Sequence, residues 1–459
     1  MIGEKRLKEI ADKALTLSKA KETEVLIIAS SLGLTRFANN EIHQNVEVDE
    51  AEISIRVVVG KKVGVAGGNI QIKSHSSKLE DYKPLKDIID KALEIAKASN
   101  KDPDFPGLPK VAQGTKDKAK NLKSIYKSTI NFSPKNRAEA VAIIIKQAEK
   151  NRLTAFGSLQ NGFTEYVIAN SHGVFGYHPV SNAYLNIRMM KGERSGYSGF
   201  ISTNISDIDF DRLAKEAVMK TTFGNEISDL EPGDYEVILE EPAVSEMMQF
   251  LSYLGFGAKQ FHEGSSFVSG KLNEKVLGEN VNIFDDPFHA QTIPIPFDFE
   301  GMPKKKMVLV ENGVVKNIAY DNYYGKRYGK KPTGHALPAP NSEGPFPFHL
   351  TLSPGKTPRA ELIKGVRYGI LVTRFWYVNP IHPKILNITG MTRDGTFLIK
   401  NGKIVGALRN LRFTQSIPEA LSNVINIAKE VKAEEGIVGA NIVPALHIGK
   451  FHFTGESRL

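Results

Sequence analysis

The amino-acid sequence predicts an α+β protein whose first half mixes helices with strands and whose second half is dominated by strands. Apolar residues recur at helical spacing in residues 3–19, whereas residues 23–30 and 51–60 are rich in the β-branched and apolar residues of strands. In the second half, Asn-Gly steps at 312–313 and 401–402 lie between strand-like arms. Asn-Gly favours a hairpin turn because both positions tolerate a positive φ.

The first half is expected to alternate helical and extended segments. Within the strand-like run 34–48, Asn39-Asn40 is predicted to form a hairpin turn. Residues 100–121 are rich in Pro, Gly and Lys and are predicted to connect two helices. The other helices expected from apolar spacing are 82–98, 135–150 and about 207–221, and further strands lie in 153–193.

A domain boundary is predicted near Glu231-Pro232-Gly233, which divides the chain into an N-terminal domain, 1–230, and a C-terminal domain, 231–459. A length of 459 residues is ample for two or three domains. Beyond the boundary, residues 329–349 are predicted to be a long irregular loop. Residues 417–432 are predicted to form a last helix before the closing strands.

Composition limits the classes of function. The formal net charge is +9, and there are no cysteines, which excludes disulfides, a thiol nucleophile and a zinc site with sulfur ligands. The chain has no apolar run of the roughly 18 residues that a membrane span needs, and no apolar signal region, so a cytoplasmic location is expected. Lysine clusters at 304–306 and 326–331 could attract an acidic partner or nucleic acid, but solvated loops are the preferred interpretation.

The segment 240–264 follows a strand-like run and is the first candidate for a site. Pro242 suits the first helical position. No histidine lies between Pro242 and Leu254, so this helix cannot hold a metal by itself. The predicted buried stripe is Val244, Met247, Met248, Leu251 and Leu254, and the predicted outward face is Ser245, Gln249, Ser252 and Phe256.

Other residues able to carry chemistry have simpler structural interpretations. The pair His262-Glu263 lacks the second histidine of a zinc-binding helix. His447 and His452 are expected on opposite faces of one strand, which disfavours a shared metal. Asp285-Asp286 could bind a hard cation, although a turn before Pro287 is the preferred interpretation.

Several stretches together resemble the TldD/PmbA family of metalloproteases. They include "LTRFANNEIHQNVEV", "VIANSHGVFGYH", "FVSGKLNEKVLGENVNIFDDP", "VLVENGVVKNIAYDNYYGKR", "NITGMTRDGTFLIKNGKIVGAL" and "VPALHIGKFHFTG", and they span nearly the whole chain in the family's order. The resemblance implies an N-terminal mixed α/β domain and a C-terminal domain of mostly antiparallel, barrel-like strands.

The family has two kinds of subunit. The TldD kind carries zinc on a His-Glu-x-x-x-His helix with a later cysteine, and the TldE (PmbA) kind lacks that site and pairs with TldD. Placed on this pattern, Gln249 and Leu254 stand where the zinc histidines would be, Phe250 stands where the glutamate would be, and the cysteine falls near Gly436. Zinc peptidases need three protein ligands and a carboxylate base. The resemblance therefore implies no catalytic, cofactor-binding or metal-binding residue in this chain.

The leading hypothesis is a TldE/PmbA-like, non-zinc subunit of a cytosolic TldD/TldE-type zinc metallopeptidase. The resemblance implies that a TldD-like partner holds the zinc and cleaves unfolded or small peptides in a closed chamber. This chain would shape the chamber and present strand edges to an extended peptide.

Two alternatives stay open. One is a homodimeric binding or regulatory protein that acts without TldD, since the resemblance also links the family to modulation of DNA gyrase. Direct reading of DNA is not expected, because no recognition helix is visible. The other is an autonomous hydrolase whose site is assembled in space from His172, His178, His262 or His289.

Overall fold

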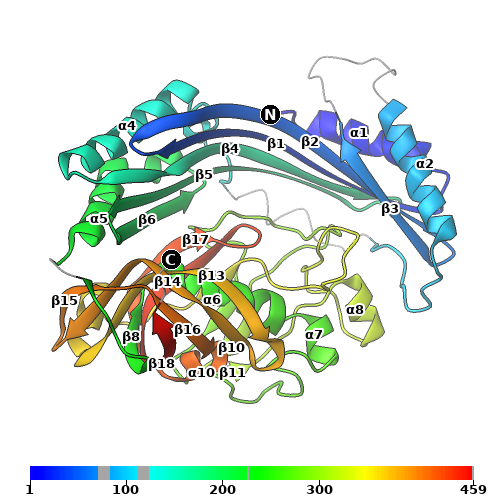
Figure 1. Ribbon diagram of the computed structural model, residues 1–459. Helices are drawn as coiled ribbons and strands as arrows, with labels where there is room; N and C mark the ends of the chain where they lie inside the picture. The colour runs from blue at the N-terminus through cyan, green and yellow to red at the C-terminus, as the bar shows by residue number, and fades with distance from the viewer. Residues whose placement is uncertain (71–82, 111–122, 225–226, 457–459) are drawn as a thin grey trace.

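The computed structural model describes residues 1–70, 83–110, 123–224 and 227–456. A curved six-stranded sheet from the N-terminal half arches over a β-rich part that holds the C-terminal half (Figure 1). The structure confirms the α+β class, with helices on the N-terminal sheet and a barrel-like arrangement of strands in the C-terminal part. The predicted connector 100–121 lies outside the described residues from residue 111 onward.

The N-terminal sheet is antiparallel throughout, in the order β3-β2-β1-β4-β5-β6. Its first hairpin turns at Asn39 and Asn40, whose φ values of 52° and 61° confirm the predicted turn. The strands predicted separately within residues 23–60 are joined into two long strands that stay paired along their length. The strand bounds are β1 Glu22–Ala38, β2 Glu41–Val59, β3 Lys62–Asn69, β4 Thr154–Asn170, β5 Phe175–Lys191 and β6 Arg194–Ser202.

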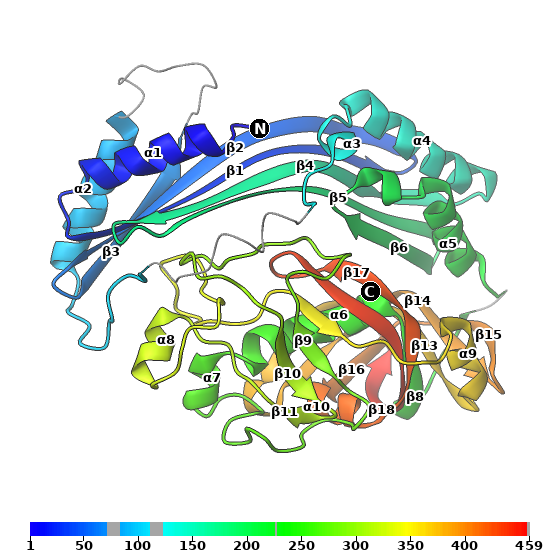
Figure 2. The same cartoon turned by 180° about the vertical axis from the view of Figure 1, so that it is seen from behind.

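Helices cover the outer, convex face of this sheet (Figures 1 and 2). The four predicted helices are confirmed to within a few residues. At the start of the third, Ser133 and Asn136 form a capping box, in which each side chain bonds the backbone N–H of the other. The bounds are α1 Glu4–Leu17, α2 Lys83–Ala98, α3 Lys127–Ile130, α4 Pro134–Lys150, η3 Ile205–Asp207 and α5 Phe210–Thr222.

The C-terminal part is one mixed sheet in the order β11-β10-β9-β12-β18-β8-β13-β14-β15-β7, with β16 and β17 attached. Most pairs are antiparallel, whereas β12–β18, β8–β13 and β7–β15 are parallel. Asn312 and Asn401 both have a φ of 50°, which confirms the two Asn-Gly hairpins. The strand bounds are β7 Ile227–Ser228, β8 Gly233–Leu239, β9 Ile283–Asp285, β10 Met307–Glu311, β11 Val314–Val315, β12 Leu350–Leu352, β13 Tyr368–His382, β14 Asn387–Lys400, β15 Lys403–Leu408, β16 Leu411–Ser416, β17 Val424–Glu435 and β18 Ala440–Glu456.

Short helices and one long loop complete the C-terminal part. Residues 329–349 contain no helix or strand and all lie within the described chain, which confirms the predicted loop. Among the described residues, no helix is long and apolar enough to cross a bilayer. The helical bounds are α6 Glu241–Phe250, η4 Leu251–Gly255, α7 Ala258–His262, α8 Asn322–Arg327, α9 Arg359–Leu362, η5 Ile363–Gly365, η6 Pro383–Ile385 and α10 Ile417–Ser422.

The last predicted helix, 417–432, is wrong over most of its length. Only the first six residues are helical, as α10, and residues 424–435 form β17, which pairs with β18. Asn423 ends the helix, and its N–H bonds the carbonyls of Glu419 and Ala420. The residues that follow include the β-branched Val424, Ile425, Ile427 and Val431. Such residues favour a strand where a partner edge is available, and β18 supplies that edge.

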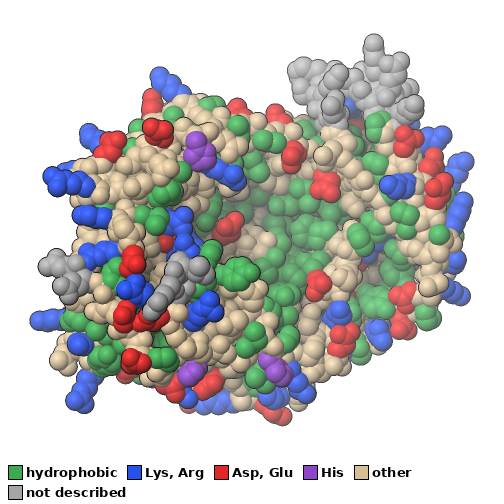
Figure 3. Space-filling model, viewed as in Figure 1, with side chains coloured by type: hydrophobic (Ala, Val, Ile, Leu, Met, Phe, Trp, Pro, Cys, Tyr) green, Lys and Arg blue, Asp and Glu red, His purple; other side chains and the backbone are tan. Residues whose placement is uncertain are grey.

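The two parts meet across the inner, concave face of the N-terminal sheet. Leu26 and Ile168 on that face pack with Phe299, Phe346 and other aromatic residues of the C-terminal part. In the space-filling view, hydrophobic side chains gather in a hollow between the two parts (Figure 3). This hollow lies on the side of the sheet opposite its helices.

A buried ion pair also joins the two parts. The Arg56 guanidinium of β2 lies 2.7 Å from Glu24 of β1 and 3.1 Å from Glu300 of the C-terminal part. The three side chains are nearly buried, so the guanidinium holds two carboxylates where water is scarce. Breaking such a pair on one side leaves a buried charge without a partner.

Candidate functional site

The candidate segment 240–264 leaves strand β8 and runs beneath the N-terminal sheet as α6, η4 and α7 (Figure 1). Pro242 lies in the first turn of α6, as predicted. The helix continues into a π-helical turn, Leu251–Gly255, before the chain reaches α7. Single π-helical turns redirect side chains and are frequent at functional sites.

Four of the five residues predicted as the buried stripe are buried and Leu254 is only partly buried, whereas the prediction is wrong for three of the four residues expected to face outward. Ser245, Ser252 and Phe256 are buried, and only Gln249 stays partly exposed. The Ser245 hydroxyl accepts a hydrogen bond from Asn441, and the Ser252 hydroxyl donates to the carbonyl of Pro347. The helix is enclosed on more than one side, so its polar side chains bond within the fold instead of meeting water.

The side chain of Gln249 connects the candidate segment to β17. Its Nε2 atom donates to the backbone carbonyl of Glu435 at 3.0 Å. Glu435 directly precedes Gly436, so the structure brings together two positions that the family resemblance gives to zinc ligands. One amide donor is already used in this bond, and a glutamine side chain is a weak ligand for zinc.

Phe250 and Leu254 make the rest of this side of the segment apolar. Both are partly buried against the C-terminal core, and the Phe250 ring lies 6.4 Å from that of Tyr253. Tyr253 in turn packs among the residues on the inner face of the N-terminal sheet. Glu246, four residues before Phe250, has its pKa raised by burial, with Arg374 acting in the opposite direction. Phe250 and Leu254 thus extend the C-terminal core, and Tyr253 is the residue that connects this segment to the sheet.

The four scattered histidines lie in separate places. His172 lies in the turn between β4 and β5, His262 ends α7 and stacks on Tyr328 with ring centroids 3.4 Å apart, and His289 lies in the loop after β9. His178 is buried on β5, and burial lowers its pKa to about 4. Among the described residues, no three His, Asp or Glu side chains lie close enough to hold a metal ion.

His447 and His452 lie on the same face of β18, so the prediction of opposite faces is wrong. A register shift between Ile448 and Phe451 places the two histidines opposite residues 238 and 234 of β8, which are four positions apart. His447 is buried, whereas His452 is exposed. The His452 Nδ1 atom lies 2.7 Å from a carboxylate oxygen of Asp234. The extra residue of this bulge reverses the alternation of side chains, and each imidazole lies near a different carboxylate of β8, Glu236 for His447 and Asp234 for His452.

The pair Asp285-Asp286 does bind cations, but they are lysine side chains of the same chain. The Lys304 ammonium lies 3.1 Å from Asp285, and the Lys306 ammonium lies 2.9 Å from Asp286. Lys304 is fully buried, so the prediction that the cluster 304–306 is a solvated loop is wrong for this residue. The interpretation as a turn holds for Asp286, whose carbonyl accepts a hydrogen bond from the N–H of His289 across Pro287, whereas Asp285 ends strand β9.

The buried carboxylate of Asp285 is fully used by its neighbours. His335 Nε2 lies 3.0 Å from one oxygen, and the N–H groups of Phe348 and His349 donate to the other. Burial alone would raise the pKa of Asp285, but Lys304 and His335 hold it well below the usual range. This cluster ties the loop 329–349 to the sheet and leaves no accessible reactive group.

A second buried charge cluster lies where α6 begins. The Glu240 carboxylate bonds Lys220 of α5 and Arg359 of α9, both at 2.8 Å. Burial favours a higher pKa for Glu240, but these two cations outweigh it and lower the pKa to about 2. Because Lys220 belongs to the N-terminal part, Glu240 fixes the start of α6 relative to the sheet above it.

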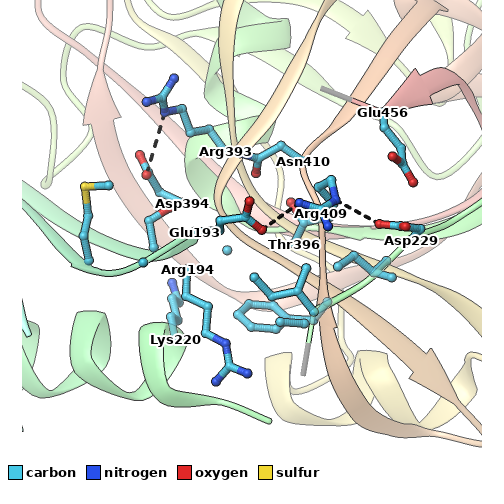
Figure 4. A pocket seen from close by; sticks show the side chains of 18 residues that line it. Glu193, Arg194, Lys220, Asp229, Arg393, Asp394, Thr396, Arg409, Asn410 and Glu456 are labelled. Atoms are coloured by element: carbon cyan, nitrogen blue, oxygen red, sulfur yellow. Dashed lines mark hydrogen bonds and ion pairs between the residues drawn. The ribbon is translucent and has the colours of Figure 1, made fainter. Parts of the chain in front are cut away.

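A polar cavity of about 520 Å³ lies where the β5–β6 hairpin meets β14 and β15 (Figure 4). Arg409 bonds Glu193 at 2.7 Å and Asp229 at 2.9 Å on one wall. Asp394 lies near Arg393 on another wall. Charges of both signs line the cavity and pair with one another, so it presents no strong field of one sign.

Three domain models of one family match successive parts of the chain. They are PmbA/TldA metallopeptidase domain 1 at residues 23–96, the central domain at residues 78–222 and the C-terminal domain at residues 232–455. Together the three matches run through nearly the whole chain.

Curated relatives include both kinds of subunit. A metalloprotease PmbA homologue from Haemophilus influenzae is 24% identical over 463 residues, which cover 96% of this chain and 95% of the relative. A metalloprotease TldD homologue from Buchnera aphidicola is 27% identical over 253 residues, which cover 54% of this chain and 52% of the relative. The chain thus spans about half the length of the TldD homologues from Buchnera that it matches.

Solved structures with the same fold cover the whole chain. TldE from Thermococcus kodakarensis has a TM-score of 0.83 at 21% identity, over 98% of this chain and 100% of that one. A Thermotoga maritima protein described as a candidate modulator of a DNA gyrase has a TM-score of 0.82 at 18% identity. The match covers 98% of this chain and 100% of that protein. At these identities the structural matches establish the fold alone.

Proposed function

We propose a function from the premise that this chain belongs to the PmbA/TldA metallopeptidase family. Within the family it acts as a TldE/PmbA-like subunit without a zinc site, and it pairs with a TldD-like chain that holds the zinc. The pair cleaves unfolded or small peptides. A cytosolic location and the division into domains 1–230 and 231–459 belong to the same proposal.

Three residues of α6 and η4 carry this proposal. Gln249 has its amide on the Glu435 carbonyl, and Phe250 and Leu254 are apolar. None of the three can replace an imidazole ligand or a carboxylate base. The match to a PmbA homologue over nearly the whole of both chains supports the PmbA-like assignment.

The chain's own contribution is to shape the space in which peptides are held. Arg56 and Glu300 hold the concave sheet onto the C-terminal part, and Glu240 fixes the start of α6 beneath it. Tyr253 joins the candidate segment to the apolar inner face of the sheet. These contacts provide a rigid, apolar wall that a catalytic partner chain can complete.

The test is metal content and peptidase activity measured on the same sample. We expect elemental analysis of the purified, untagged chain to give zinc well below one per chain, with no cleavage of a denatured protein substrate. Adding a TldD-type chain is expected to give cleavage that a chelator abolishes, with that chain alone as the control. Near one zinc per chain, with chelator-sensitive cleavage by this chain alone, would overturn the proposal and favour the autonomous hydrolase.

A further inference from the structure

The two halves of strand β2 have different neighbours. Residues 52–59 lie between β1 and β3, whereas within the described chain residues 41–50 pair with β1 alone. Every residue from Glu41 to Glu50 except Gln44 is exposed. Among the described residues, the first half of β2 is therefore an open sheet edge, and it is long enough to pair with a typical strand.

The direction of the backbone groups on this edge follows from one hydrogen bond. The Ile70 N–H donates to the Ala51 carbonyl at 2.8 Å, so the backbone groups of Ala51 point away from β1. Pairing with β1 is unbroken from Gln44 to Ala51. Because direction alternates along a strand, the N–H and C=O groups of Asn45, Glu47 and Asp49 also point outward. Such a row of unpaired groups is a template for another strand.

The concave face of this edge carries two apolar side chains, Val46 and Val48, with Gln44 and Glu50 on either side of them. Val46 and Val48 are 36% and 44% exposed, and they lie opposite Leu34 and Leu32 of β1. The same face of β1 carries Leu26, which packs against the C-terminal part. The row thus continues the apolar inner face of the sheet out to its open edge.

On the convex face of the edge, the Glu47 carboxylate lies near a buried arginine of α4. The Arg137 guanidinium of α4 is fully buried and lies over Gly33, where any Cβ would clash with it. It donates to Asn45 at 3.2 Å and lies 3.5 Å from Glu47. Arg137 therefore ties this stretch of β2 to α4.

The charge on the edge selects its partner. Residues 41–52 carry the carboxylates of Glu41, Glu47, Asp49, Glu50 and Glu52 and no Lys or Arg. Like charges directly opposite each other destabilise a strand pair, so a second copy of β2 does not suit this edge. A strand with basic side chains suits this edge, because its positive charges would lie opposite these carboxylates.

We propose that the open edge of β2 binds an extended peptide in which basic and apolar side chains alternate. The outward groups of Asn45, Glu47 and Asp49 bond the peptide backbone, its apolar side chains meet Val46 and Val48, and its basic side chains meet Glu47 and Asp49. The choice of a peptide as ligand rests on the proposed function. The edge adds to that function a preference for basic over acidic peptides.

The test uses the purified full chain and a fluorescent, end-blocked hexapeptide of alternating Lys and Val, followed by anisotropy. The key variant is Glu47→Pro, which removes one outward N–H and leaves the ladder with β1 intact. Its matched control is Glu47→Ala, which loses the same carboxylate and keeps the N–H. We expect Glu47→Pro to weaken binding by about tenfold relative to Glu47→Ala. Thermal unfolding of both variants checks that they fold alike.

A second probe changes the peptide instead of the protein. N-methylation of alternate residues removes the donors of one peptide edge, so one of the two alternating patterns is expected to abolish binding and the other to preserve it. A Glu-Val peptide is expected to bind at least about tenfold more weakly, and added salt should weaken the Lys-Val peptide.

Equal binding by Glu47→Pro and Glu47→Ala, or equal binding of both methylation patterns, would overturn the proposal. A change of oligomeric state in Glu47→Pro would also overturn it and assign the edge to self-association. The test needs no partner chain. Peptide binding without reconstituted cleavage would reject the proposed function alone, and cleavage without binding at β2 would reject this inference alone.

Discussion

Two regions of the C-terminal part differ in what their side chains are free to do. Three residues of α6 and η4 are partly exposed, but they are Gln249, Phe250 and Leu254, which have no acid–base chemistry. The cluster of Asp285 and Lys304 is rich in ionisable groups, but it is buried and its carboxylate is fully bonded. The ionisable side chains of this cluster therefore lie where a ligand cannot reach them.

This comparison shows that a side chain's accessibility to a ligand matters more for function than its residue type. A buried carboxylate with an ammonium, an imidazole and two N–H groups around it holds the fold together. A helix that keeps its place in the fold but lacks zinc ligands can still shape a surface. The following predictions would break or sharpen this contrast, starting with the largest expected effect.

Replacing Lys304 by Met should destabilise the protein most. The change leaves Asp285 buried without its main countercharge, and breaking a buried pair on one side costs about 3–5 kcal/mol. Denaturant unfolding measures the loss. The matched control is Lys306→Met, which removes the half-exposed ion pair with Asp286 and should cost about 1 kcal/mol or less. Similar losses in both variants would show that the buried cluster has no special role.

Replacing Glu240 by Gln should change the acid limb of the stability curve. The pKa of Glu240 falls from 4.5 to about 2 on folding, so its ionised form stabilises the native state above pH 4.5. That contribution is lost as pH falls from 4.5 through about 2. We expect Glu240→Gln to be less stable at neutral pH by roughly 2–3 kcal/mol and to lack this part of the acid decline. Parallel curves for the two proteins would contradict the expectation.

Replacing Gln249 by Ala should have a small effect on stability. It removes one partly exposed hydrogen bond to the Glu435 carbonyl, worth about 1 kcal/mol. The control Gln291→Ala changes an exposed glutamine and should stay within about 0.5 kcal/mol of the parent. A loss of several kcal/mol would mean that Gln249 has a larger structural role in fixing β17.

Placing two histidines on the segment should have the smallest effect. The double variant Gln249→His with Leu254→His restores two of the family's ligands, but it lacks the third ligand and the base. Elemental analysis is expected to give zinc well below one per chain, as in the parent. Stoichiometric zinc in the double variant would show that the surroundings of α6 already contain a ligand that the geometry does not reveal.

Part of the candidate site could be predicted from the sequence, and part could not. The missing histidines and the buried stripe of α6 follow from residue identity and helical spacing. The burial of Ser252 and Phe256 does not, because it depends on the loop 329–349 and on residues after α7 that close over the helix. The burial of Lys304 could not be predicted either, because three lysines in a row normally indicate a solvent-exposed segment and the contact with Asp285 is tertiary.

The sequence by itself determined the helices of the N-terminal part, the hairpin turns, and the absence of cysteine from the chain and of histidine from α6. These depend on local spacing, on the φ preferences of Asn and Gly, and on which atoms the side chains possess. Only the tertiary structure decided that Lys304 is buried, that residues 424–435 form a strand, and that within the described chain the first half of β2 pairs with β1 alone. Each of these depends on a partner from a distant part of the chain, and neither periodicity nor composition contains the position of that partner.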